Sequence, residues 1–158
     1  MSDRGRVLVT GATGFVGSAL VRAFVGARYP VRALVRATST RSNLAGLEIE
    51  SVEGDICDAA AVARAMAGVS YVVHAAAAYH LWARNSDAIM RTNVEGTRVV
   101  MHAALSAGVE RVVYTSSVAT LAPNADGQAA DEARSLSEAA CASIAACARP
   151  SQASICFG

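Results

Sequence analysis

The sequence contains no lysine, so all fourteen of its basic residues are arginines. They are interspersed with thirteen acidic residues, and the net charge of +1 gives no electrostatic case for binding nucleic acid or an anionic membrane. Aromatic residues make up 5% of the chain, so small apolar residues must fill the core. No apolar run has membrane-spanning length, and the polar N-terminus MSDRGR has no apolar signal core. We therefore expect a cytoplasmic protein without a membrane span.

Paired metal ligands are also missing. No two cysteines form a C-x-x-C pair and no histidine pair lies nearby at ligand spacing; the four cysteines are Cys57, Cys141, Cys147 and Cys156. We expect neither a zinc site nor a disulfide framework. Three of the four cysteines lie in the last eighteen residues, so the composition changes there. This predicts one domain over residues 1–133 and an atypical tail, rich in alanine and cysteine, over residues 134–158.

The segment Arg6–Leu20, RVLVTGATGFVGSAL, carries the main motif of the chain. It begins with the apolar run Val7–Val9, which is typical of a strand buried on both faces. Three glycines then follow at a spacing of three residues, and a helical pattern begins. The stripe predicted to face the core consists of Val16, Leu20, Ala23, Phe24 and Ala27. A strand, a glycine-rich turn and a helix start in this order indicate a dinucleotide-binding unit.

Each glycine has a separate predicted role in that unit. Gly11 allows the tight turn, Gly14 lets the backbone approach a pyrophosphate, and Gly17 lets the helix pack closely on the strand. The unpaired N–H groups at the helix start then face the phosphates. The other residues of this turn that we predict to bind the cofactor are Thr13, Phe15 and Val16.

The second predicted strand, Val31–Val35, is followed directly by Arg36. In such folds an acidic residue near this point binds the ribose 2′-hydroxyl of NAD, whereas arginine suits the 2′-phosphate of NADP. No Asp or Glu lies between Arg28 and Gly46. We therefore expect NADP rather than NAD. The alternative is that Arg36 is a solvated residue that at most stacks on adenine.

A third strand is predicted at Glu48–Val52, and a short helix at Ala59–Ala67. Two aspartates, Asp55 and Asp58, lie between them. An aspartate here can accept a hydrogen bond from the adenine amino group or cap the following helix, and capping is the commoner use.

The fourth predicted strand, Ser70–His74, leads into a run of alanines that leaves room for a flat ligand against the backbone; the run includes Ala75, Ala76 and Ala77. His74 could contact a ligand, but a structural role is the commoner one for a lone histidine at a strand end. The next loop, 79–82, contains the single tryptophan and predicts either a substrate contact or an aromatic plug over the core.

The longest helical pattern covers Ser86–Ala107 and precedes a fifth strand at Arg111–Ser116. Asn93 lies on the apolar face of this helix and needs hydrogen-bond partners. Gly96 on the same face predicts a close approach to the sheet. Five strands alternating with helices predict a doubly wound parallel sheet, the Rossmann fold, in the order 3-2-1-4-5. The ligand is expected over the switch between the first and fourth strands.

Several motifs together resemble the extended short-chain dehydrogenase/reductase family, also called NAD-dependent epimerases/dehydratases. They are TGATGFVG, GDI, HAAA, RTNVEGT and YTSSVATL, within about Arg6 to Glu132. The segments YHLWAR and RTNVEGTRVVMHAALSAGVERVVYTSSVATL resemble hopanoid-associated sugar epimerases and the related dihydroflavonol 4-reductases.

The resemblance implies hydride transfer between a nicotinamide and a hydroxyl or carbonyl carbon of a sugar-like or ketone substrate. It places Asp55 and Ile56 near the adenine, and the alanines after His74 along the cofactor. It also implies catalytic roles for Ser117, with Ser116 beside it, and a structural or proton-relay role for Asn93.

One family feature is missing. The family uses a tyrosine as acid/base and a lysine four residues later, but this chain has no lysine and no tyrosine at that place. After about Glu132 the resemblance ends, without the catalytic helix and substrate lobe. We expect the chain to bind cofactor but to be catalytically incomplete.

Three interpretations of the tail stay open: a fragment or shifted reading frame, a short nucleotide-sensing protein that acts through a partner, and a divergent enzyme that uses other groups. Truncation would also expose the fifth strand as a sheet edge, which predicts self-association.

Overall fold

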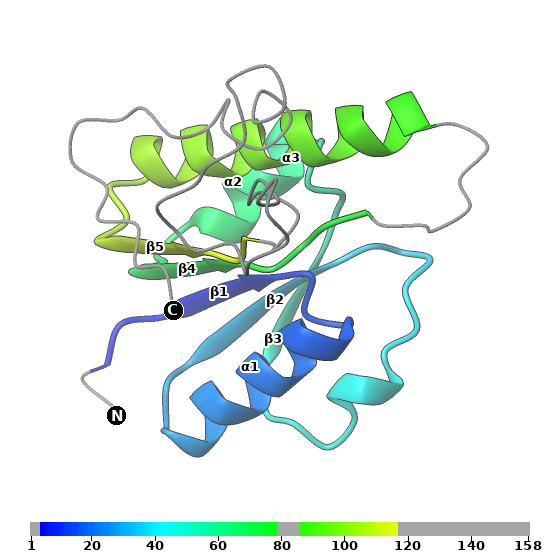
Figure 1. The fold of residues 1–158 in the computed structure, drawn as a ribbon. Helices are drawn as coiled ribbons and strands as arrows, with labels where there is room; N and C mark the ends of the chain where they lie inside the picture. The colour runs from blue at the N-terminus through cyan, green and yellow to red at the C-terminus, as the bar shows by residue number, and fades with distance from the viewer. Residues whose placement is uncertain (1–3, 79–85, 117–158) are drawn as a thin grey trace, which may run out of the picture.

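The computed structural model describes residues 4–78 and 86–116, and the fold is a parallel sheet between two layers of helices (Figure 1). The five strands are β1 (Val7–Thr10), β2 (Val31–Val35), β3 (Glu50–Glu53), β4 (Tyr71–His74) and β5 (Arg111–Tyr114). The helices are α1 (Phe15–Gly26), the 3₁₀ helix η1 (Ser42–Leu44), α2 (Ala59–Met66) and α3 (Ser86–Ser106). All strand pairs are parallel, in the order β3-β2-β1-β4-β5. The predicted fold class and strand order are confirmed.

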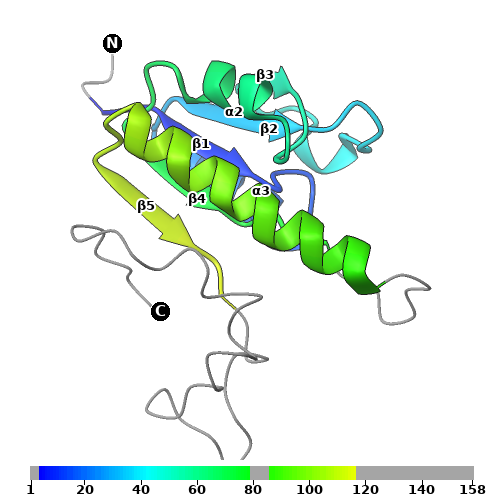
Figure 2. The ribbon, with the colours of Figure 1, turned by 90° about the horizontal axis from the view of Figure 1, so that it is seen from above.

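The central strands are buried on both faces because each face is covered by a helical layer. Figure 1 shows α1 on one side of the sheet and α2 and α3 on the other, and Figure 2 shows α3 lying over the sheet roughly along the strands, with β5 beside it. Val7 and Val9 of β1 belong to the core cluster on the α1 side, whereas Leu8 belongs to the cluster under α2 and α3. This alternation explains why the strand reads as a continuous apolar run.

The stripe of α1 that was predicted to face the core is wrong in part. The buried residues of the helix are Gly17, Ser18 and Val21, whereas Val16 is 48% exposed. Leu20 and Phe24 pack partly against the core as expected, but Ala23 and Ala27 are exposed. Compared with the predicted orientation, α1 is rotated about its own axis. The face toward the preceding turn carries Gly17, because only a residue without a side chain fits there.

The third strand begins two residues later than predicted, at Glu50 rather than at Glu48. Ile49 packs from the preceding loop against the α1-side core, and ladder pairing starts where Glu50 lies opposite Arg32. The 3₁₀ helix η1 was not predicted. It follows the end of β2 and contributes the buried Leu44 to the same core.

Strand β2 carries a buried arginine that composition did not indicate. Arg32 is 6% exposed, and its Nη1 donates 2.7 Å hydrogen bonds to the carbonyl oxygens of Ala65 and Ala67 at the end of α2. Its Nε lies 3.0 Å from Glu50 Oε2, an ion pair by distance, but the N–H is not aligned for a hydrogen bond. The cation therefore satisfies carbonyl groups that a helix end leaves unpaired.

At the edge of the described sheet, β5 pairs with β4 alone among residues 4–78 and 86–116. Val113 on this strand is 38% exposed and Leu105 on α3 is 69% exposed. Association through this edge stays a prediction. Within the same residues, no helix is long and apolar enough to span a membrane.

Candidate dinucleotide site

The turn between β1 and α1 lies against the backbone that follows β4. Gly11 has a φ of +67°, which favours glycine, and a Cβ there would lie 2.7 Å from Ala75 O and from backbone atoms of Ala76. The turn therefore needs glycine both for its conformation and for space. Two of the predicted site segments, the glycine-rich turn and the alanine run, meet at this point.

The start of α1 provides an uncapped row of backbone donors. Gly14 is the N-cap residue and offers no side-chain hydrogen bond, and the first turn contains no acidic residue. The first helical hydrogen bond runs from Ser18 N–H to Gly14 O. The N–H groups of Phe15, Val16 and Gly17 have no partner among the described residues. Such a helix start is a ready anion site.

Gly17 brings α1 against this turn, which follows β1, rather than against the strand itself as predicted. A Cβ on Gly17 would lie 2.1 Å from Gly11 O and 2.7 Å from Gly11 C, which are backbone atoms with little freedom to move. In contrast, Phe15 projects from the turn with 90% of its surface exposed.

A buried network fixes the three elements behind the turn. The His74 ring is fully buried; its Nδ1 lies 2.6 Å from Thr10 Oγ1 and its Nε2 lies 3.0 Å from Thr97 Oγ1. Thr10 Oγ1 also accepts a 3.3 Å hydrogen bond from the N–H of Ala76, and the His74 ring stacks on Tyr114. In neutral imidazole one nitrogen donates and the other accepts, so the two hydroxyls take complementary roles. The structure supports the structural role expected for His74.

The free energy of unfolding should fall below neutral pH because of His74. Burial lowers the pKa of His74 from 6.5 to about 4. Its stabilising contribution is therefore complete above pH 6.5 and is lost as the pH falls toward 4, because the unfolded chain takes up the proton first. Between about pH 7.5 and about pH 5, we expect the wild type to lose about 2 kcal/mol more than a His74→Gln variant.

Urea unfolding at the two pH values measures this difference. His102→Gln, at an exposed position on α3, is the matched control and should follow the wild type. Equal pH dependence in wild type and His74→Gln would contradict the assignment.

Asn93 of α3 holds the segment that follows β4. Its Oδ1 accepts a 2.7 Å hydrogen bond from the Ala78 N–H, and its Nδ2 donates a 2.9 Å bond to Ala78 O. The predicted need for partners is thus met by both backbone groups of one residue. Ser116 lies two residues beyond β5, where the Thr115 N–H donates to His74 O. Asn93 therefore contacts the segment that follows β4, and Ser116 comes directly after the residue that bonds to His74, the last residue of β4.

Gly96 allows a close approach, but not to the sheet as predicted. A Cβ at Gly96 would lie 2.4 Å from Ile56 Cδ1, in the loop after β3. The Ile56 side chain therefore packs under α3, and its predicted contact with the cofactor stays a prediction.

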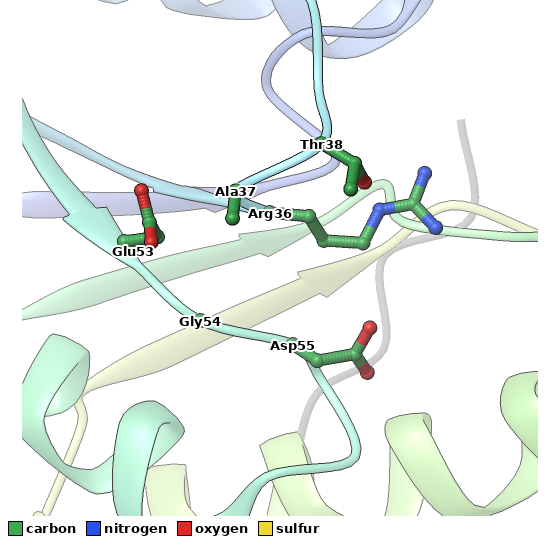
Figure 3. A pocket seen from close by; sticks show the side chains of 6 residues that line it. All are labelled: Arg36, Ala37, Thr38, Glu53, Gly54 and Asp55. Atoms are coloured by element: carbon green, nitrogen blue, oxygen red, sulfur yellow. The ribbon is translucent and has the colours of Figure 1, made fainter.

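A pocket of about 310 Å³ lies between the ends of β2 and β3 (Figure 3). Figure 3 shows the Arg36 guanidinium and the Asp55 carboxylate extending toward the same end of the pocket, with Glu53 at the other end. Asp55 Oδ1 accepts a 2.9 Å hydrogen bond from the Cys57 N–H. The helix cap is instead Asp58, which accepts from Ala60 and Ala61.

The connection that follows β2 is tied to the glycine-rich turn by residues that the sequence did not single out. Asn43 of η1 donates a 2.9 Å hydrogen bond from Nδ2 to Thr13 O. Arg22 of α1 donates a 2.6 Å bond to Asn43 O. The connection after β2 is therefore fastened to the glycine-rich turn.

Several predictions fall outside the described residues and stay predictions: those for Ser117, for the loop 79–82 and for the tail from residue 134. Burial and the nearby Asp55 raise the pKa of the Cys57 thiol, which keeps it in the less reactive protonated form. No cluster of potential metal ligands occurs in the part of the chain that the structure describes.

Comparison with known proteins identifies relatives of this arrangement. The model of the NAD dependent epimerase/dehydratase family matches residues 7–147, running past Glu132, where the resemblance of the individual motifs ends. A putative dihydroflavonol 4-reductase from Synechocystis sp. is 49% identical over 124 residues, which are 78% of this chain and 36% of the relative.

Solved structures show the same similarity. The crystal structure of gox2253 is 48% identical with a TM-score of 0.80, over 86% of this chain and 41% of that chain. UDP-glucose 4-epimerase from Thermus thermophilus, in complex with NAD, is 30% identical with a TM-score of 0.74, over 89% of this chain and 48% of that chain. The chain therefore spans less than half the length of each of these relatives.

Proposed function

Because the chain belongs to the NAD dependent epimerase/dehydratase family, we propose that it binds a nicotinamide dinucleotide at the carboxyl edge of the sheet, and NADP in preference to NAD. The observation that carries this proposal is the glycine-rich turn, which ends in uncapped backbone donors at the start of α1. No side chain of the first helical turn competes for those donors, and the dipole of α1 favours an anion there.

The described residues fit each part of such a cofactor. Gly14 and the N–H groups after it would hold the pyrophosphate. The pocket beside Arg36 and Asp55 would take the adenosine end, and the alanines after β4 would lie along the nicotinamide end. Phe15, exposed at the turn, lies beside the proposed pyrophosphate position.

The NADP preference rests on Arg36. Its side chain is exposed at the pocket and makes no hydrogen bond or ion pair with any residue that the structure describes. A free guanidinium can bind a 2′-phosphate through paired hydrogen bonds. The Thermus relative described above was crystallised with NAD, so the preference needs a direct titration of both cofactors.

We further propose that the 158-residue chain binds its cofactor without turning over substrate. The bound nicotinamide supplies or accepts hydride in this family, with a sugar-like or ketone substrate as the partner. The family's acid/base tyrosine is followed four residues later by a lysine that lowers its pKa, and this chain has neither a lysine nor a tyrosine at that place. Asn93, which is committed to Ala78, orients backbone rather than moving a proton.

Calorimetric titration of the purified chain with NADPH and NADH tests the proposal. We expect one saturable site, tighter for NADPH by about threefold to tenfold because of charge-assisted bonds to the 2′-phosphate. NADPH oxidation with carbonyl substrates should stay at the background rate. Failure of a folded chain to bind either cofactor would contradict the main proposal. Tighter binding of NADH would contradict the preference, and turnover proportional to chain concentration would contradict catalytic incompleteness.

A further inference from the structure

Arg36 and Glu53 both line the pocket between β2 and β3. The Arg36 side chain has no partner among the described residues, whereas Glu53 Oε2 lies 3.0 Å from Nη2 of Arg41, a residue outside the pocket lining. We propose that Glu53 weakens the preference for NADP by holding Arg41 away from the 2′-phosphate. This inference rests on the proposed cofactor site, and it adds a specificity-determining pair, Arg41 and Glu53, to that site.

The register of the sheet places Glu53 beside the end of β2, where Arg36 is proposed to select the cofactor. Glu53 is the last residue of β3 and lies opposite Val35, the residue before Arg36. Its side chain lines the pocket together with Arg36 (Figure 3). The carboxylate that holds Arg41 is therefore part of the wall of the proposed adenosine site.

The backbone that carries Arg41 is fixed, so a change of partner needs side-chain rotation alone. Arg41 is the N-cap residue of η1, and Leu44 at the end of η1 is buried in the core. Between them, Asn43 is hydrogen-bonded to Thr13 O. The guanidinium can move on its flexible stem while the loop stays in place.

The ion pair is exposed enough to exchange. The side chains of Arg41 and Glu53 are 48% and 60% exposed, and ion pairs of this kind contribute little to stability. A 2′-phosphate offers more negative charge and a matched set of acceptors, so it competes for Arg41. A 2′-hydroxyl carries no charge, so with NAD the guanidinium stays on Glu53. The carboxylate therefore opposes NADP and leaves NAD unaffected.

Titration of four forms of the full 158-residue chain tests this mechanism: wild type, Glu53→Gln, Arg41→Ala and the double variant. We expect Glu53→Gln to bind NADPH about fivefold more tightly, with NADH affinity within about twofold of wild type. The gain should disappear when Glu53→Gln is introduced into Arg41→Ala. Glu48→Gln is the matched control, because it removes the same charge from an exposed residue before β3 and should change neither affinity.

Three results would overturn the inference. An equal gain for NADPH and NADH would mean that Glu53 acts on the whole cofactor. A gain that persists without Arg41 would mean that Glu53 acts by direct repulsion. Unchanged NADPH affinity in Glu53→Gln, in a chain whose wild type binds both cofactors, would refute the competition itself. If the folded wild type binds neither cofactor, the proposed site fails first and this mechanism fails with it.

Discussion

Replacing Gly17 by alanine should destabilise the chain by about 3 kcal/mol and weaken cofactor binding by at least about tenfold. Alanine is normally the better helix former. At this position, however, its Cβ would lie 2.1 Å from Gly11 O, so α1 must move away from the turn. That movement displaces the N–H groups proposed to bind the pyrophosphate. Urea unfolding and NADPH titration of the same variant measure the two effects.

Gly26, in the last turn of the same helix, provides the control. A Cβ there meets nothing within 4 Å, so Gly26→Ala should leave binding unchanged and stabilise the chain by about 0.5 kcal/mol. The same substitution therefore has opposite expected signs at two positions of one helix. Wild-type stability and binding in Gly17→Ala would show that the close contact does not constrain the turn.

Replacing Arg32 by methionine should lower the free energy of unfolding by about 3 kcal/mol. Methionine keeps much of the buried apolar volume of the arginine but removes its cation. The carbonyl oxygens of Ala65 and Ala67 would then lose their 2.7 Å hydrogen bonds from Nη1. Because Glu50 is 47% exposed, water can solvate its carboxylate, and the unpaired carbonyls account for most of the loss.

Arg98→Met is the matched control for this variant. Arg98 makes a 2.6 Å ion pair with Glu95 on the surface of α3, with its side chain 44% exposed. Loss of that pair should change stability by less than about 0.5 kcal/mol. A similarly small change in Arg32→Met would mean that the end of α2 does not depend on the buried cation.

The strand order could be predicted because it follows from the alternation of short apolar runs with helical patterns. The glycine-rich turn could be predicted because its glycines serve local geometry: a positive φ at Gly11 and a backbone contact at Gly17. The strand order and the glycine-rich turn both depend on patterns among residues that are close together in the sequence. The pairing of Gly11 with Ala75 follows from the parallel register of β1 with β4.

The missed side-chain contacts join residues that are distant in the sequence. The pair of Arg32 with the end of α2 spans more than thirty positions, and the hydrogen bond from Asn43 to Thr13 spans thirty. Gly96 indicated a close approach, but its partner proved to be Ile56 in the loop after β3 rather than the sheet. A side-chain hydrogen bond across the fold leaves no periodic signal, so residue type alone could not identify these partners.

The central claim is that the backbone amides at the start of α1 hold the cofactor pyrophosphate. Amide proton–nitrogen correlation spectra of the labelled chain, recorded with and without NADP, test it directly. The account predicts that the amide signals of Phe15, Val16 and Gly17 move most on saturation, while that of the exposed Gly26 stays in place. A well-dispersed spectrum in which these three signals do not respond to saturating NADP or NAD would contradict it.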